Sequence, residues 1–171
     1  MKAQDITLCL TIGRRPELLR QTLESLFSQI SFEHIIAIND FRDEETNQVF
    51  RELCPTGILL NLAEQVGHHK AVDVMYAQVK TNYIFHCEDD WLFDQPIQIE
   101  EYINILKNDS SATSIVLRKL SDFSFTEEEF NKIQFIQNSD ITTAKLTKLH
   151  DQWHGFTFNP HISPITMWKA T

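Results

Sequence analysis

The stretch ITLCLTIGRRPELLRQTLESLF, residues 6–27, changes from one hydrophobic pattern to another at Gly13. Its first part, residues 6–12, is apolar or β-branched almost throughout, which predicts a strand buried on both faces. After Pro16, a residue that suits the first turn of a helix, apolar residues recur every three or four positions. We therefore expect a strand followed by a helix whose apolar face covers a sheet.

The same alternation of strand and helix patterns continues as far as Lys119. The expected elements are strand 34–39, helix 43–53, strand 57–61, helix 68–79, strand 82–87, helix 98–108 and strand 113–119. Strands that alternate with helices form a mainly parallel sheet through right-handed crossovers. The predicted fold class is therefore α/β: a Rossmann-like domain with helices on both faces of a mainly parallel central sheet.

The pattern weakens after Lys119, where acidic, Ser/Thr and Phe-rich pieces mix without a sustained period. Loops with one or two short elements are expected there. Near the end of the sequence we expect a strand, a turn at Asn159 and Pro160, and a helix that begins near Ser163 and Pro164. No repeat or low-complexity linker interrupts the chain, so a single domain is expected over residues 1–171.

The composition indicates a globular, acidic chain. Hydrophobic residues make up 42% of the sequence, and four Gly and five Pro are too few for a disordered or fibrous protein. The net charge of −9 disfavours sequence-independent binding to nucleic acid or anionic lipid. The sequence starts without a signal-peptide pattern and has no apolar run long enough for a membrane span, so a cytoplasmic location is expected. Cys9, Cys54 and Cys87 lack CxxC spacing, which favours buried thiols over disulfides or a zinc site.

Three consecutive carboxylates stand among apolar and aromatic neighbours in NYIFHCEDDWLF, residues 82–93. Two ionised carboxylates about 4 Å apart repel by about 4 kcal/mol at the effective dielectric of a protein surface. Either the run ends in a wet loop where each charge is hydrated, or a cation that prefers oxygen ligands lies among the charges. Strand alternation would place Glu88 and Asp90 on one side and Asp89 on the other.

Polar residues and glycines follow the ends of the predicted strands. Ligands of open parallel α/β sheets bind at the carboxyl ends of the strands. Thr11 and Gly13 end the first strand, and Asp40 follows the second. Gly67 opens the helix after the third strand, and the acidic triplet 88–90 ends the fourth. These residues are therefore expected to meet at one edge of the sheet.

Two segments, in this order, resemble family 2 glycosyltransferases of the GT-A fold. TLCLTIGRRPELLRQTLESLFSQ, residues 7–29, is similar to the opening strand and helix of that family. GHHKAVDVMYAQVKTNYIFHCEDDWLF, residues 67–93, is similar to its glycine-led helix, the following strand and its acidic DXD-type motif. The resemblance implies a single GT-A domain. Residues 1–95 would form the nucleotide-sugar-binding half. Residues 120–171 would form a partial acceptor side, truncated relative to the family, which they match poorly.

The resemblance also implies roles for residues at this edge. Thr11, Gly13 and Asp40 would contact the nucleobase, with Asp40 accepting hydrogen bonds from a uracil-like ring. Alternatively, Asp40 caps the turn or helix that follows it. Gly67 and Lys70 would lie close to the nucleotide, at a helix N-terminus that favours an anion. A solvated helix face is the alternative for Lys70.

The acidic triplet would, by the same resemblance, hold a divalent cation. Asp90 is the implied ligand of Mn²⁺ or Mg²⁺, and Asp89 is a second candidate. Glu88 or Asp89 would hold the ribose or a metal-bound water. Asp151 is the candidate catalytic base, and His154 a candidate third metal ligand or base; a structural role is the alternative for both. Hydrated carboxylates that cap the next helix are the alternative for the triplet.

The expected function is metal-dependent transfer of a hexosyl-type group from a UDP- or GDP-sugar to an unknown acceptor hydroxyl. The alternative is a nucleotide-sugar-binding module without turnover, because the acceptor half departs from the family. A nucleotidyltransferase fits less well, since LTIGRRPELL, residues 10–19, has a single Gly where such enzymes have a Gly-rich loop. The Phe-rich pieces after Lys119 would bury against a further segment of chain or against a second copy in a homo-oligomer.

Overall fold

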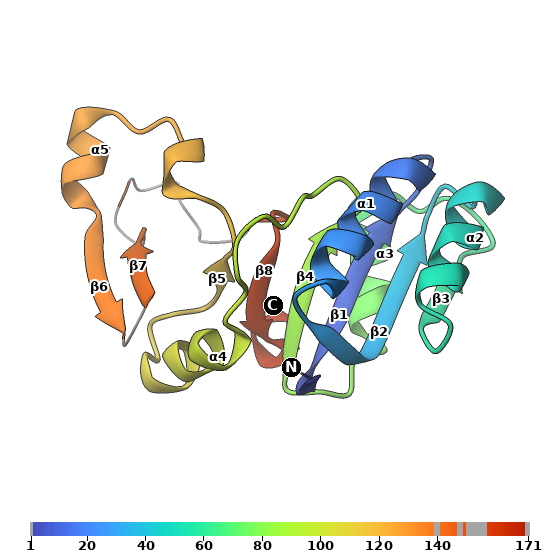
Figure 1. Cartoon of the computed structure of the whole chain (residues 1–171), viewed down its shortest axis with the longest axis horizontal. Helices are drawn as coiled ribbons and strands as arrows, with labels where there is room; N and C mark the ends of the chain where they lie inside the picture. Colours follow the sequence, from blue (N-terminus) through green and yellow to red (C-terminus); the bar gives the residue numbers. More distant parts are fainter. Residues whose placement is uncertain (1, 139–140, 147–148, 150–156, 170–171) are drawn as a thin grey trace.

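The computed structural model describes residues 2–138, 141–146, 149 and 157–169 (Figure 1). Its main sheet has six strands in the order β3-β2-β1-β4-β8-β5. They are β1 (Lys2–Ile12), β2 (Ser31–Asn39), β3 (Ile58–Asn61), β4 (Tyr83–Glu88), β5 (Ile115–Val116) and β8 (His161–Pro164). The first four strands pair in parallel, and β8 runs antiparallel to both of its neighbours. The prediction of a mainly parallel sheet is confirmed.

Helices cover both faces of this sheet. They are α1 (Pro16–Phe27), α2 (Glu44–Leu53), α3 (His68–Tyr76), α4 (Ile99–Asn108) and α6 (Ile165–Lys169). Alternate residues of β1 enter two hydrophobic clusters: Leu8 and Leu10 pack with α1, α2 and α4, whereas Cys9 packs with α3 and α6. The uninterrupted apolar pattern of β1 therefore reflects burial on both faces, as predicted. Within the described residues, no helix has the length and apolar character that crossing a bilayer requires.

The segment after Lys119 is more regular than its sequence predicts. It contains η1 (Leu120–Asp122), α5 (Glu127–Lys132), β6 (Gln134–Asn138) and β7 (Ile141–Lys145). β6 and β7 form a separate antiparallel sheet, which Figure 1 shows at the opposite end of the molecule from β3. A capping box begins α5, because Thr126 and Glu129 each bond to the other's backbone N–H. The expectation of one or two short elements was therefore too low.

The last elements also begin at other residues than predicted. Ser163 and Pro164 end β8, and the helix starts one residue later. Ile162 and Ser163 pair with Phe85 and Ile84 of β4, so sheet pairing prevails over the helix-starting tendency of Pro. Pro164 is tolerated there because β5 pairs only with the first half of β8 and leaves the other edge of Pro164 without a strand.

Two buried histidines on neighbouring strands, His86 of β4 and His161 of β8, stack on each other. The ring centroids of His86 and His161 lie 5.2 Å apart. Nδ1 of His86 shares a 2.8 Å hydrogen bond with the hydroxyl of Tyr76, and Nδ1 of His161 lies 2.9 Å from the carbonyl oxygen of Asn159. Burial lowers the pKa of both imidazoles, and for His86 the neighbouring His161 lowers it further. Both side chains are therefore neutral in the folded protein at pH 7.

We expect the His86→Gln variant to lose less stability than the wild-type protein between pH 7 and pH 5. The unfolded histidine titrates near about 6.5, so protonation favours the unfolded chain, and each such histidine costs up to about 1.4 kcal/mol per pH unit below that value. Urea unfolding at both pH values measures the difference.

Exposed His34 is the control, and His34→Gln should show the same change of unfolding free energy with pH as the wild-type protein. Wild type and variant are compared because burial raises the pKa of Asp89 to about 6, which acts in the opposite sense. Equal slopes for wild type and His86→Gln would contradict the prediction.

Candidate functional site

A pocket of about 110 Å³ lies where the carboxyl ends of β1, β2 and β4 meet. Five residues predicted from the sequence line it together: Thr11, Gly13, Asp40, Glu88 and Asp89. The other lining residues are Ile12, Arg15, Ile38, Phe41, Gln65, His68 and Ala71. The edge of the sheet therefore gathers residues from segments that lie far apart in the sequence, as the strand order requires.

Asp89 is fully buried at the centre of this edge. Its Oδ2 accepts a 2.9 Å hydrogen bond from the backbone N–H of Gly13, and its Oδ1 lies 2.6 Å from Nη2 of Arg15. Burial raises the pKa of the Asp89 carboxyl to about 6, although the Gly13 N–H and the charge of Arg15 oppose that rise. Asp89 thus fastens the end of β4 to the turn between β1 and α1.

Arg15 links Asp89 to the next carboxylate. Its Nη1 lies 2.6 Å from Oδ2 of Asp90, a carboxylate whose side chain is 36% exposed. Glu88 is half-buried beside them, and both burial and the negative charge of Asp90 raise the pKa of its carboxyl. The triplet therefore directs Asp89 inward and Asp90 outward, with one guanidinium between the two aspartates.

Polar residues of α1, and Gln29 just beyond its end, hold the segment that follows the triplet. The hydroxyl of Thr22 accepts a 3.0 Å hydrogen bond from the N–H of Trp91. Ser25 accepts one of 3.2 Å from the N–H of Phe93, and the side-chain amide of Gln29 donates one of 2.7 Å to the carbonyl of Phe93. One helix face thus supplies both the apolar contacts to the sheet and the hydrogen bonds that fix where the chain goes after Asp90.

Asp40 organises the loop before α3. Its two carboxylate oxygens accept hydrogen bonds of 2.8 Å from the backbone N–H groups of Val66 and Gly67. Gly67 is the residue that precedes α3, and its φ of +88° is one that Gly adopts readily. The helix after Asp40 is capped by Asp43 instead, which accepts from the N–H of Thr46 at 3.0 Å. The capping alternative considered for Asp40 is therefore wrong for α2.

A hydrogen-bond network that the sequence analysis missed joins the turns after β1 and β2. Oδ1 of Asn39 accepts from the N–H groups of Phe41 at 3.1 Å and Arg42 at 2.8 Å. Asp43 accepts a 2.7 Å hydrogen bond from the N–H of Arg14. Arg14 and Arg42 have φ values of 60° and 62°, so this network holds two non-Gly residues in the left-handed region. An Asn directly after a run of buried strand residues was the feature in the sequence that indicated such a turn.

The remaining predicted residues lie away from the pocket or outside the described chain. Lys70 is exposed on the first turn of α3. Neither Lys70 nor Gly67 nor Asp90 is among the residues that line the pocket. Asp151 and His154 lie outside the described residues. Of the lining residues that were not predicted, His68 packs its ring against Phe158 at a centroid distance of 4.4 Å.

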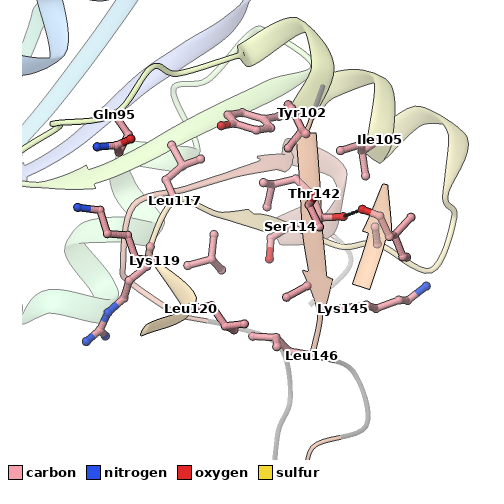
Figure 2. A pocket seen from close by; sticks show the side chains of 18 of the residues that line it. Gln95, Tyr102, Ile105, Ser114, Leu117, Lys119, Leu120, Thr142, Lys145 and Leu146 are labelled. Carbon is pink, nitrogen blue, oxygen red and sulfur yellow. Dashed lines mark hydrogen bonds between the residues drawn. The ribbon is translucent and has the colours of Figure 1, made fainter. Parts of the chain in front are cut away.

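A larger cavity of about 520 Å³ lies beyond the triplet (Figure 2). It is bounded by the chain from Leu92 to Ile97, by α4, by the segment around β5 and by the β6–β7 hairpin. Figure 2 shows Leu117 and the aromatic ring of Tyr102 in the same cavity as polar side chains such as Ser114 and Thr142. Its two lysines are paired: Lys119 with Asp94 at 2.7 Å and Lys145 with Asp109 at 2.8 Å. Arg118 also lines the cavity, so three cationic side chains stand against two carboxylates. The cavity is therefore amphipathic, and its lining carries a formal net charge of +1.

Comparison with protein families shows which family the chain belongs to. The model for "Glycosyl transferase family 2" matches residues 8–161, which include all the lining residues of both the small pocket and the larger cavity. The chain belongs to glycosyl transferase family 2. No curated protein sequence matches the chain. The family predicted from residues 7–29 and 67–93 is thus confirmed.

Solved structures show the same fold at low sequence identity. TarS 1-349 from S. aureus in complex with UDP aligns with a TM-score of 0.63 and 12% identity, over 97% of this chain and 48% of that one. The mannosyltransferase PcManGT from Pyrobaculum calidifontis, in complex with GDP-Man and Mn²⁺, aligns with a TM-score of 0.57 and 13% identity, over 67% of this chain and 35% of that one. This family 2 chain therefore has the predicted GT-A fold and spans half or less of the length of these proteins.

We expect Gly13→Ala to destabilise the protein by about 1–3 kcal/mol, the usual range for overpacking. A Cβ atom at this position would lie 2.4 Å from Cδ2 of Phe41 and 3.1 Å from Oδ1 of Asn39, so the turn that presents the Gly13 N–H to Asp89 would shift. The midpoint of urea unfolding measures the loss. A midpoint equal to that of the wild-type protein would show that the turn absorbs a methyl group without cost.

Proposed function

We propose that this family 2 chain transfers a hexosyl-type group from a UDP- or GDP-sugar to a hydroxyl acceptor, assisted by a divalent cation. The observation that carries the proposal is the pocket in which Thr11, Gly13, Asp40, Glu88 and Asp89 meet at the carboxyl edge of the sheet. Family membership supports it, as do the UDP bound to TarS and the GDP-Man and Mn²⁺ bound to PcManGT.

The carboxylates at the end of β4 fit Mn²⁺ or Mg²⁺ as hard oxygen donors. In the described part of the chain, no group of three or more His, Cys, Asp or Glu side chains suffices for a metal site. These cations commonly take one or two carboxylates, with substrate phosphates and waters as the other ligands. We assign Asp90 and Glu88 to the cation, with Asp89 as an inward-facing support. When bound, the cation would neutralise charge on the departing nucleoside diphosphate.

The chain's own residues would hold the rest of the donor. Thr11 and Gly13 would contact the base from the end of β1. Each oxygen of Asp40 accepts one backbone hydrogen bond, and a carboxylate oxygen has a second lone pair for a base N–H. Lys70, on the first turn of α3, would add positive charge on the phosphate side. Asp151 as base and His154 as a further ligand remain proposals for residues outside the described chain.

The larger cavity is our candidate for the acceptor site. It begins at Leu92 and Phe93, directly after the acidic triplet, and its volume of about 520 Å³ lies in the usual range of ligand pockets. Apolar and aromatic surface next to hydroxyl and amide groups suits a hydroxylated compound with an apolar face. The two Lys–Asp pairs offset their own charges, which leaves Arg118 as the remaining positive charge of the lining.

A nucleotide screen tests the donor half of this proposal. UDP or GDP should raise the melting temperature in the presence of Mn²⁺, because a ligand that binds only the folded form stabilises it. Asp90→Asn should remove the part of the shift that depends on Mn²⁺, whereas Glu100→Gln, a change of an exposed carboxylate on α4, should keep it. No shift with any nucleoside diphosphate would contradict the proposal. A shift without release of nucleoside diphosphate from any sugar donor, in assays that include acceptors, would favour a binding module instead.

Filling the larger cavity tests the acceptor half. Ser114 lies among the cavity side chains in Figure 2, so Ser114→Trp should block the space while leaving the Mn²⁺-dependent nucleotide shift unchanged. With a panel of sugars and polyols, the rate of nucleoside diphosphate release that acceptors stimulate should fall at least about tenfold, as expected for a substrate excluded from its site. Ser121→Trp, at an exposed position outside the cavity lining, is the matched control. Equal stimulation in wild type and Ser114→Trp would place the acceptor elsewhere.

A further inference from the structure

We propose that Arg15 is an internal counter-ion for the acidic triplet, which competes with the divalent cation for Asp90 and pairs with the donor diphosphate once the cation is bound. This inference rests on the proposed function. Arg15 is the one Lys or Arg side chain among the residues that line the small pocket in the described part of the chain. Its guanidinium nitrogens lie 2.6 Å from oxygens of both Asp89 and Asp90.

The two ion pairs of Arg15 differ in how firmly their carboxylates are held. Asp89 is fully buried, and its other oxygen accepts from the N–H of Gly13, so the protein fixes it in place. Asp90 lies at the surface with a side chain that is 36% exposed. A pair between exposed groups is weak and readily exchanged, whereas it is costly to leave the fully buried Asp89 carboxylate without its counter-charge, even though Arg15 itself is 45% exposed. Arg15 is therefore anchored through Asp89 and can exchange its partner on the Asp90 side.

The charges of the cluster explain why such an exchange would be useful. Glu88, Asp89 and Asp90 carry three negative charges within three consecutive residues, and Arg15 supplies one positive charge. Without a cation, Arg15 offsets part of the repulsion and holds Asp90 in place. A divalent cation at Asp90 would displace the guanidinium from that carboxylate. A nearby diphosphate would then offer Arg15 a new anionic partner with bidentate geometry.

This arrangement links the affinity for the cation to the presence of the nucleotide. The cation alone must displace Arg15 and remain close to its positive charge, so it binds weakly. When the cation and a nucleoside diphosphate bind together, the diphosphate gives both the cation and the displaced Arg15 an anionic partner, so each ligand strengthens the binding of the other. Couplings of this kind are reciprocal and usually amount to about 5- to 150-fold in affinity.

The experiment compares Mn²⁺ binding without nucleotide to nucleotide binding with Mn²⁺, by calorimetry and by the spectroscopic signal of free Mn²⁺. We expect Arg15→Gln to bind Mn²⁺ alone about tenfold more tightly than the wild type and to bind UDP or GDP in Mn²⁺ about tenfold more weakly. Arg15→Lys keeps the charge but cannot pair with both aspartates at once, so it should bind Mn²⁺ alone more tightly and lose less nucleotide affinity. Arg20→Gln, which breaks the 2.7 Å ion pair between Arg20 of α1 and Glu52 of α2, should change neither affinity.

Changes of opposite sign distinguish this role from a structural one, because misfolding would weaken both affinities. Circular dichroism checks whether Arg15→Gln is folded. If Arg15→Gln does not fold, Arg15→Lys is used for the same comparison of the two affinities. If the wild type binds nucleotide in Mn²⁺ and Arg15→Gln binds Mn²⁺ alone no more tightly than the wild type, the counter-ion role is overturned and the proposed function stands. If the wild type and Arg15→Gln bind Mn²⁺ under no condition, both are overturned.

Discussion

The site depends on one buried carboxylate. An unpaired charge in the position of Asp89 would be strongly destabilising, so its burial requires hydrogen-bond donors and a positive charge close by. The N–H of Gly13 and the guanidinium of Arg15 provide them, and both belong to the turn between β1 and α1. Satisfying this carboxylate therefore fixes that turn against the end of β4. The walls of the small pocket follow from this single contact.

The strand order makes this contact available. Because β1 lies between β2 and β4, the ends of three parallel strands emerge side by side, and each delivers a polar residue to the same edge. Asp40 then holds the loop before α3 through Val66 and Gly67, and polar residues on α1 hold the chain after Asp90. The sheet provides the approximate positions, and a few side-chain-to-backbone hydrogen bonds complete them. Such bonds are short and directional, so they define loop geometry that apolar packing alone leaves free.

The parts of this arrangement that the sequence predicts are those set by local periodicity. Uninterrupted apolar runs and a Pro-started helix predicted β1 and α1, and strand ends predicted that Thr11, Asp40 and Glu88 would meet. The partners of Asp40 and Asp89 could not be predicted, because they lie far away in the sequence and depend on sheet register. The role of Arg15 was not predicted either, because the partners of its ion pairs, Asp89 and Asp90, lie far along the chain. The β8 strand was missed for the same reason, since its pairing with β4 prevails over the local pattern of Ser163 and Pro164.

The two halves of the chain differ in what determines their shape. In the pocket at the sheet edge, backbone groups at strand ends and helix starts do much of the positioning, and these are imposed by the parallel sheet itself. The larger cavity is formed mainly by side chains of α4, the segment around β5 and a separate two-stranded sheet. Side chains can change one at a time without altering strand order, whereas the sheet edge cannot be altered without disturbing the core. A pocket fixed by the sheet edge, joined to a second cavity whose side chains can change independently, is the physical outcome expected of such a division.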